Sequence, residues 1–267
     1  GIEYGIPQTS ERIDFILSGK GSDDRDQVVI VELKQWAVAT KTDRDGIVRT
    51  RFAGGEADTS HPSYQAWAYA SLLRDFNEAV YDGNIALNPC AYLHNYVDNG
   101  VLTDGFYEEY LKSAPVFLKG EAERLRLREF IAQHVRCGDQ GKVLYRIEQG
   151  RIRPSKGLVD ALSGMLAGQQ EFVLVDDQKV VYETALAIAR EAAATGKKKV
   201  VIVDGGPGTG KSVVAINLLV ALTEGRLVAK YVTKNAAPRD VFKTKLSGSM
   251  RRSRIDNLFV GSGAFTE

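Results

Sequence analysis

At 267 residues the chain is long enough for two domains, because one hydrophobic core seldom serves much beyond about 250 residues. Its composition, 44% hydrophobic and 26% charged, is that of an ordinary globular protein and excludes a fibrous or low-complexity chain. No apolar run reaches the roughly 18 residues that a membrane-spanning helix needs, so we expect no membrane partner.

Charge is divided unevenly along the sequence. Residues 1–120 carry 11 Lys and Arg against 18 Asp and Glu, whereas residues 121–267 carry 24 against 16. This division suits a divalent-cation site in the first part and phosphate or nucleic-acid binding in the second, although many solvated surfaces are equally lopsided. Cys90 and Cys137 lack metal-ligand spacing and predict small packing residues in a reducing compartment such as the cytoplasm.

The first part of the chain is predicted to mix short strands with helices. Strands are expected at 2–7, 12–17, 28–36 and 86–97. A turn at 8–11 joins the first two strands, and a polar, glycine-rich mobile loop covers 37–60. Ser60-His61-Pro62 is typical of a helix start, and the helix is expected to run through 64–80.

Residues 116–165 are predicted to form a helical connector, with helices at 121–136 and 157–168. The domain before it is expected to span 1–115 and the domain after it 166–267. In the second domain a long helix closing at Gly196 precedes the strand KKKVVIVDG, the helix SVVAINLLVALTEG and the strand LVAKYVTKN. Strand, helix and strand at this spacing predict a parallel sheet with a right-handed crossover.

Charged residues on adjoining strands of the first domain predict a metal site. Strand alternation puts Glu32 and Lys34 on one face, and Asp14 lies beside Glu32 if the two strands pair as a hairpin. The two carboxylates and the Leu33 carbonyl would hold Mg²⁺ or Mn²⁺ through hard oxygen ligands. Lys34 would position the nucleophile or neutralise the transition state. A cross-strand salt bridge on a solvated face is the alternative.

The next helix carries a second pair of polar residues. Gln65 and Tyr69 are four positions apart and share a helix face. RIDFIL, VVIVELK and QAWAY, in this order over residues 12–69, resemble the PD-(D/E)XK nucleases, whose RecB-like members carry Q-x-x-x-Y beside the metal site. The resemblance implies a restriction-endonuclease-like mixed sheet flanked by helices, with Gln65 and Tyr69 positioning substrate or active-site groups. The alternative is a helix with a core Tyr and a solvent-facing Gln.

This resemblance has one departure. The nuclease fold usually opens with a helix before the first strand, whereas this sequence begins almost at the strand.

The sequence GGPGTGKS in the second domain fits the phosphate-binding pattern G-x-x-x-x-G-K-[ST], between a predicted strand and a predicted helix. Its glycines let main-chain amides wrap a phosphate at the positive end of the helix. Lys211 would contact the β- and γ-phosphates of ATP, and Ser212 would ligate Mg²⁺. The predicted ATP-binding residues are Gly205, Gly206, Pro207, Gly208, Thr209, Gly210, Lys211 and Ser212.

ATP hydrolysis needs a further acidic residue at a strand end, and no apolar strand after Ser212 ends in one. We therefore expect the ATPase domain to be truncated before that strand and ATPase activity only in a longer chain.

Two flanking features indicate the kind of ATPase. Gln178 lies at the distance from the loop at which superfamily 1 helicases place an adenine-reading glutamine. Thr233, Lys234 and Asn235 resemble the early helicase motif that contacts a single-strand backbone. Residues 165–267 therefore resemble the beginning of a Schlafen-like ATPase/helicase domain, which implies a partial RecA-like P-loop fold. A solvated helix-start glutamine and an ordinary strand-to-helix cap are the alternatives.

Together the two parts predict a Mg²⁺-dependent deoxyribonuclease, coupled in the longer protein to an ATP-binding helicase-type motor, with DNA as partner in preference to RNA. Restriction of foreign DNA or repair follows by analogy only. One rival is a catalytically inactive nuclease-like module that binds nucleic acid and carries a P-loop nucleotide switch. Another is a plain ATPase preceded by an unrelated α/β scaffold.

Overall fold

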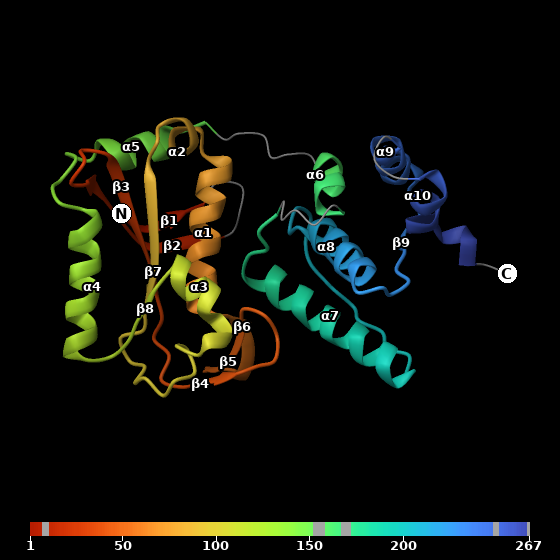
Figure 1. Cartoon of the computed structure of the whole chain (residues 1–267), viewed down its shortest axis with the longest axis horizontal. Coiled ribbons are helices and arrows are strands. Elements are labelled where there is room, and N and C mark those ends of the chain that lie inside the picture. The colour runs from red at the N-terminus through yellow and green to blue at the C-terminus, as the bar shows by residue number, and fades with distance from the viewer. Residues whose placement is uncertain (7–10, 152–157, 167–171, 248–250, 266–267) are drawn as a thin grey trace. The chain divides into compact units, whose positions relative to one another are not determined.

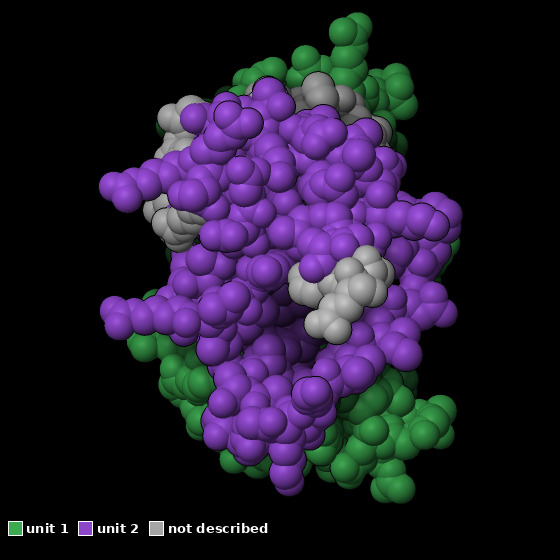
Figure 2. All heavy atoms as spheres, turned by 90° about the vertical axis from the view of Figure 1, so that its right-hand side faces the viewer, with its two compact units in different colours: residues 1–155, 175–180 green, residues 156–174, 181–267 purple. Residues whose placement is uncertain are grey.

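The computed structural model of the chain describes residues 1–6, 11–151, 158–166, 172–247 and 251–265 (Figure 1). Two compact units make up the chain, coloured separately in Figure 2. The first unit comprises Gly1–Ser155 and Val175–Val180, and the second comprises Lys156–Leu174 and Val181–Glu267. None of the described helices has the length and apolar character needed to cross a membrane.

The first unit is built on a five-stranded mixed sheet in the order β1-β2-β3-β7-β8. Its strands are β1 (Ile2–Gly5), β2 (Arg12–Lys20), β3 (Asp26–Leu33), β7 (Ala86–Tyr92) and β8 (Val116–Phe117). β1, β2 and β3 pair antiparallel, whereas β3, β7 and β8 pair parallel. Four of these strands form where strands were predicted, although β1, β3 and β7 end earlier than expected and β2 runs on to Lys20, whereas β8 was not predicted. Of the expected turn at 8–11, residues 8–10 lie outside the described residues.

Helices cover both faces of this sheet because the central strand β3 is apolar on both sides. Val29 and Val31 pack with Phe117 and with α4 (Glu121–His134) on one face. α1 (Pro62–Phe76) packs against β3 and β7 on the other face (Figure 1). The shorter helices of the unit are α2 (Glu78–Asp82), η1 (Gly105–Tyr107), α3 (Glu108–Ser113) and α5 (Lys142–Gln149). Burial on both faces is typical of a central strand with a parallel neighbour.

A second, three-stranded antiparallel sheet occupies the region expected to be a mobile loop, so that expectation was wrong. Its strands are β4 (Ala39–Lys41), β5 (Ile47–Phe52) and β6 (Gly55–Ser60). In β5 the side chains of Val48 and Thr50 are buried while Arg49 and Arg51 are exposed. This alternation is that of a half-buried strand, but its outward positions are charged and its ends are rich in glycine, which made it read as a loop.

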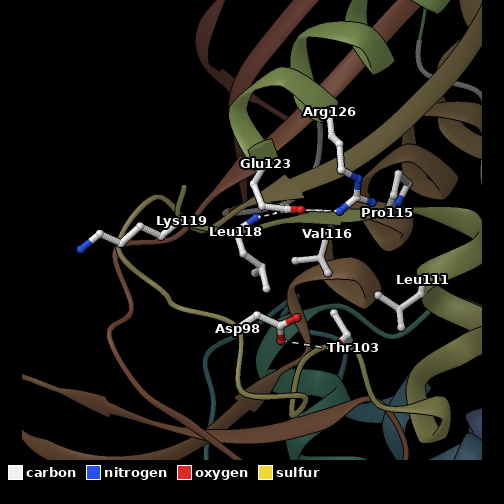
Figure 3. A pocket seen from close by; sticks show the side chains of 9 residues that line it. All are labelled: Asp98, Thr103, Leu111, Pro115, Val116, Leu118, Lys119, Glu123 and Arg126. Carbon is white, nitrogen blue, oxygen red and sulfur yellow. Dashed lines mark hydrogen bonds and ion pairs between the residues drawn. The ribbon is translucent and has the colours of Figure 1, made fainter. Parts of the chain in front are cut away.

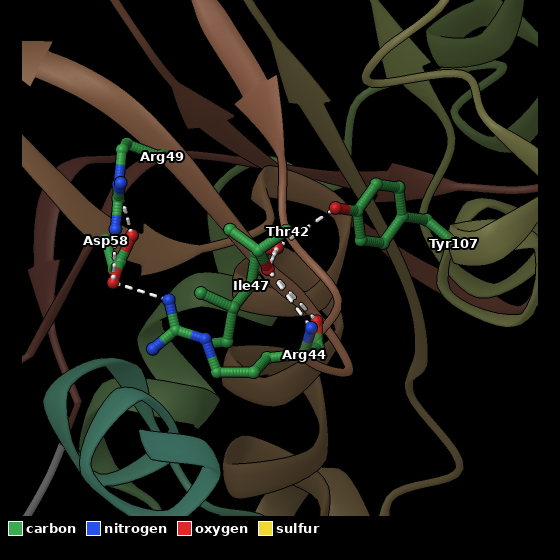
Figure 4. Close-up of polar contacts among 6 residues, drawn as sticks. All are labelled: Thr42, Arg44, Ile47, Arg49, Asp58 and Tyr107. Carbon is green, nitrogen blue, oxygen red and sulfur yellow. Dashed lines mark hydrogen bonds and ion pairs between the residues drawn. The ribbon is translucent and has the colours of Figure 1, made fainter. Parts of the chain in front are cut away.

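Polar contacts fix the turn between β4 and β5 (Figure 4). Arg44 and Arg49 both donate to the carboxylate of Asp58 on β6. The hydroxyls of Thr42 and Tyr107 donate to the carbonyl oxygen of Ile47 at 2.7 and 2.9 Å. The carboxylate–guanidinium contacts hold the pKa of Asp58 below its usual value.

The stretch expected to be a connector, 116–165, starts inside the first unit. β8 extends the sheet next to β7, α4 packs on β3 and β8, and α5 packs on β2 and β3. The apolar side of α4, which includes Phe130, is what ties it to the sheet. The helix expected at 157–168 is observed as α6 (Leu158–Met165), and residues 157, 167 and 168 lie outside the described residues.

The second unit is mostly helical. Besides α6 it contains most of α7 (Asp176–Thr195), α8 (Lys211–Glu224), α9 (Ala236–Leu246), α10 (Arg252–Leu258), η2 (Ser262–Phe265), β9 (Tyr231–Thr233) and β10 (Phe259–Gly261). Its core joins α6, α8 and α9 through Leu162, Ile216 and Phe242. β9 lies within the expected strand 227–235 and pairs in parallel with β10, a strand that was not predicted, whereas the parallel partner expected at 197–205 is not observed.

The apolar segment before the P-loop does not form the buried strand that was predicted, so that prediction was wrong. Residues 199–204 form no strand, and the side chains of Val200 and Ile202 are each 88% exposed. A strand of this composition is stable when neighbouring strands satisfy its main chain and helices cover it. Within the described residues of this unit the sheet consists of β9 and β10.

Candidate functional site

Three charged residues meet where β2 and β3 run side by side. The register pairs Phe15 with Val31, and one further step places Asp14 opposite Glu32. The Lys34 ammonium donates to Oε1 of Glu32 at 2.6 Å, and the main-chain N–H of Leu33 donates to Oδ2 of Asp14 at 2.8 Å. The ion pair therefore lies along β3 and on a covered face, unlike the cross-strand, solvated pair that was the alternative.

Glu32 is the most unusual residue of the group. Its side chain is 2% exposed, and its Oε2 atom has no hydrogen-bond partner among the described residues. Burial raises the pKa of this carboxyl to about 8, against the opposing effect of Lys34 and with a further increase from Asp14. A buried carboxylate oxygen without a partner is costly unless a proton or a cation satisfies it.

Gln65 and Tyr69 lie on the buried side of α1, near this carboxylate. The amide Nε2 of Gln65 donates to the Tyr69 hydroxyl at 2.8 Å, and both side chains are buried. Burial raises the pKa of Tyr69, and the charges of Asp176 and Glu32 raise it further. The i, i+4 spacing thus produces a bonded pair facing the acidic residues, in place of a solvent-facing glutamine.

α1 begins after His61, which acts as its N-cap. The Nδ1 atom of His61 accepts from the Ser63 N–H, and Nε2 lies 3.1 Å from the Leu102 carbonyl oxygen. Burial lowers the pKa of His61 to about 4, so the ring is neutral near pH 7. This histidine therefore fixes the start of the helix that carries Gln65 and Tyr69.

Two further acids belong to the same group and were missed from the sequence. The Tyr69 hydroxyl donates to Oδ2 of Asp176 at 2.5 Å and lies 3.4 Å from Oε2 of Glu11. Asp176 opens α7 and is counted with the first unit. Burial raises its pKa, and a hydrogen bond with Glu11 raises it further. Asp176 is 107 positions from Tyr69, and an acid in the first turn of a helix is ordinarily read as a helix-end charge.

Asp14 and Glu32 are the residues of this group that could hold a divalent cation. Asp14 and Glu32 offer hard carboxylate oxygens, and the unpartnered Oε2 of Glu32 is an atom that a cation would satisfy. Across the described part of the chain, no group of three or more His, Cys, Asp or Glu is arranged to hold a metal ion. Mg²⁺ commonly uses one or two carboxylates together with waters and phosphate oxygens, which is what this donor set allows.

A separate pocket of about 230 Å³ lies between the start of α4 and the segment around Asp98 (Figure 3). Two of its charged groups are paired: Arg126 donates to Glu123, and Glu123 accepts from the Leu118 N–H at 3.2 Å. Asp98 accepts from the Thr103 hydroxyl. None of the predicted site residues lines this pocket.

The P-loop of the second unit leads into α8 as predicted. Gly208 and Gly210 have φ of 77° and 82°, which a residue with a Cβ rarely adopts. The Lys211 ammonium lies 2.6 Å from the carbonyl oxygens of both Gly205 and Gly206, at the centre of the loop. Thr209 donates to the Gly206 carbonyl, and Ser212 is exposed in the first turn of α8. The loop therefore gathers the groups that the pattern assigns to phosphate and Mg²⁺ binding.

Residues 233–235 form a strand-to-helix cap. Oδ1 of Asn235 accepts from the Ala237 N–H at 3.1 Å, and the Thr233 hydroxyl oxygen accepts from the Asn235 N–H at 3.3 Å. Lys234 is exposed between them. Capping was the alternative role for this segment, and contact with a nucleic-acid backbone stays a prediction.

Gln178 lies in the first turn of α7, where its Oε1 accepts from the Val175 N–H at 3.4 Å. This contact is that of a helix-start residue, which was its alternative role. Residues 175–180 are counted with the first unit, and the role of Gln178 in adenine binding stays a prediction.

Comparison with known proteins gives one match, confined to the second unit. No curated protein matches the chain, and no solved structure matches it. None of these comparisons supports a nuclease in the first part of the chain. Residues 198–267 match the family model described as "Schlafen group 3, DNA/RNA helicase domain". This end of the chain therefore has the sequence of a Schlafen-type helicase domain. The match implies a function related to nucleic acids.

Proposed function

We propose that the first unit is a metal-dependent nuclease that hydrolyses DNA phosphodiester bonds, next to an ATP-binding helicase-type unit. The observation that carries this proposal is Glu32: a buried carboxylate with an unpartnered oxygen, beside Asp14 and within 2.6 Å of the Lys34 ammonium. A buried acid of this kind next to a cation is typical of sites that move protons or bind metal ions.

Each residue of the group has a role in hydrolysis. Asp14 and Glu32 would hold Mg²⁺ or Mn²⁺, which supplies an activated water and charge stabilisation when bound. Lys34 keeps the Glu32 carboxylate oriented and offers its ammonium to the phosphate as the water attacks phosphorus and the bond to the leaving oxygen breaks. Gln65 and Tyr69 hold the groups on the α1 side at fixed distances. The attacking water would lose a proton to solvent, and the leaving oxygen would take one from solvent.

The second unit is proposed to bind ATP and single-stranded nucleic acid. Lys211 and Ser212 would contact the phosphates and Mg²⁺, and Gln178 would read the adenine. Thr233, Lys234 and Asn235 would lie along a nucleic-acid backbone. The support for this part is the helicase-domain match over 198–267 together with the loop geometry.

The alternative function is an inactive nuclease-like module that binds nucleic acid and responds to nucleotide. Two observations favour it: Lys34 is paired with Glu32, and a group of three acidic, His or Cys ligands is absent from the described residues. In this case Asp14 and Glu32 would bind no metal, and nucleic-acid binding would not depend on Mg²⁺.

Cleavage of labelled single- and double-stranded DNA and of RNA, in Mg²⁺ or Mn²⁺, distinguishes these functions. Glu32→Gln keeps the shape of the side chain but removes the anion, and we expect cleavage to fall at least about 100-fold. Lys211→Ala should cut as fast as the parent chain while losing ATP binding. A folded parent chain that binds Mn²⁺ but cuts none of these substrates would overturn the nuclease proposal, and one that binds neither metal nor nucleic acid would favour the plain ATPase scaffold.

A further inference from the structure

Asp176 lies at the candidate nuclease site, although it is not part of the sequence pattern over residues 12–69 that predicted this site. Its Oδ2 atom accepts from the Tyr69 hydroxyl at 2.5 Å, and its Oδ1 atom lies 3.4 Å from the Ser60 hydroxyl. Tyr69 in turn accepts from the Gln65 amide at 2.8 Å. Gln65, Tyr69 and Asp176 therefore form one hydrogen-bonded chain, in which Asp176 accepts from Tyr69 and makes a further hydrogen bond with Glu11.

A second contact fixes the first turn of α7 independently of Asp176. The ammonium of Lys179 is buried, donates to Asp45 at 2.8 Å and lies 5.0 Å from the centre of the Tyr64 ring. The close approach depends on Gly46, whose φ is 63° and where an added Cβ would lie 3.2 Å from the Lys179 Cε atom. The position of Asp176 is thus determined by two separate sets of contacts.

The surroundings of Asp176 point to a role in the site. Glu32, with its unpartnered and buried Oε2 atom, is close enough for the two charges to affect each other, and so is Lys34. Collecting acids in a poorly solvated place lowers stability unless a ligand or a function compensates. Tyr69 connects these acids to Gln65 on α1.

We infer that Asp176 is a positioning residue of the nuclease site, acting through Tyr69, an inference that rests on the proposed nuclease function. By accepting from the hydroxyl, Asp176 selects one rotamer of Tyr69 and leaves the hydroxyl oxygen free to accept from Gln65. The α1 side of the site is then held in a single geometry. Because α7 continues from this unit into Val181–Thr195 of the second unit, the nuclease site is completed by the helix that links the units in sequence.

The chain offers conservative and matched variants to test this inference. Asp176→Asn keeps an acceptor for Tyr69 and adds a donor for Glu11, so it should cut DNA within about threefold of the parent rate. Asp176→Ala removes the acceptor, and kcat should fall about 10- to 100-fold. Asp177→Ala removes the same charge from the neighbouring, exposed position and should leave the rate unchanged.

Three readouts decide the outcome. The first readout is the rate of DNA cleavage. The second is Mn²⁺ affinity, measured by titration calorimetry, and the affinity of Asp176→Ala should lie within about threefold of that of the parent chain. The double variant with Asp176→Ala and Tyr69→Phe should cut no more slowly than Tyr69→Phe alone, since both changes break the Tyr69–Asp176 hydrogen bond and only Tyr69→Phe also removes the acceptor for Gln65. Unchanged cleavage in Asp176→Ala, multiplicative loss in the double variant, or a parallel loss of Mn²⁺ affinity would each overturn the positioning role.

The proposed nuclease function can fail separately. A parent chain that cuts no DNA overturns that function and this inference with it. A parent chain that cuts DNA, with an Asp176→Ala variant that cuts equally fast, overturns the inference alone.

Discussion

Glu32 shows how one residue can make stability depend on pH. Its carboxyl is buried, its pKa is raised to about 8, and it faces Lys34, Asp14 and Asp176. The folded state therefore binds a proton that the unfolded state has already lost above pH 4.5, the ordinary value for glutamate. The contribution of Glu32 to stability is greatest below that value and declines as the pH rises toward 8, by about 1.4 kcal/mol for each pKa unit of the shift.

We expect the metal-free chain to lose thermal stability between pH 5.5 and 8.5, and Glu32→Gln to lose much less. The side-chain amide introduced by this substitution stays neutral over this range, so the free-energy cost of burying it is the same at pH 5.5 and at pH 8.5. Thermal unfolding followed by circular dichroism at several pH values measures the effect. Equal slopes for the two proteins would show that Glu32 is not the group responsible.

At the scale of elements, strands and helices were predictable where apolar periodicity was strong. The strand carrying Glu32, the helix carrying Gln65 and Tyr69, and the helix after the P-loop form where the pattern placed them, although the second of these ends at Phe76 and not at 80. The β4–β6 sheet was missed because its exposed positions carry charge, which conceals the alternation of β5. The site was predictable as far as local spacing reaches, whereas Glu11 and Asp176 join it through tertiary contacts that no local pattern encodes.

A substitution at Gly46, just before β5, tests how the β4–β6 sheet packs against α7. Gly46→Ala should lower the free energy of unfolding by about 1 to 2 kcal/mol, because φ of 63° disfavours a Cβ and Lys179 and Tyr64 lie within 3.3 Å of it. Urea unfolding of the first unit measures the change. Gly54→Ala is the control, since no atom lies within 4 Å of the added Cβ and its φ is not positive, and it should be close to neutral. Equal effects at both glycines would contradict the packing argument.

At the scale of the whole molecule, the functions proposed for the two units rest on different observations. The second unit combines the P-loop sequence pattern with a helicase-domain match over 198–267. The proposal for the first unit rests on the geometry of its acidic site. The excess of Lys and Arg after residue 120 agrees with this division, because nucleic-acid affinity is dominated by contacts with phosphate.

Lys234 offers a test of nucleic-acid binding by the second unit. Lys234→Ala should weaken single-stranded DNA binding and reduce the slope of log K against log salt by about 0.7, the value expected for one phosphate contact on a single strand. Fluorescence anisotropy at several salt concentrations measures both. Lys230→Ala, a similar change beside β9, is the control. Equal slopes in the parent chain and Lys234→Ala would restrict residues 233–235 to capping α9.

The exposed segment before the P-loop has a consequence for how the isolated protein behaves in solution. Residues 200–203, VVIV, combine high β-propensity with exposed side chains, and main-chain groups at such a segment can pair with the same segment of another molecule. Lys197, Lys198 and Lys199 precede it directly, in the position where charged gatekeepers repel identical chains. Intermolecular strand pairing should therefore be favoured by high salt, which screens these lysines, and concentrated samples are best kept at low ionic strength.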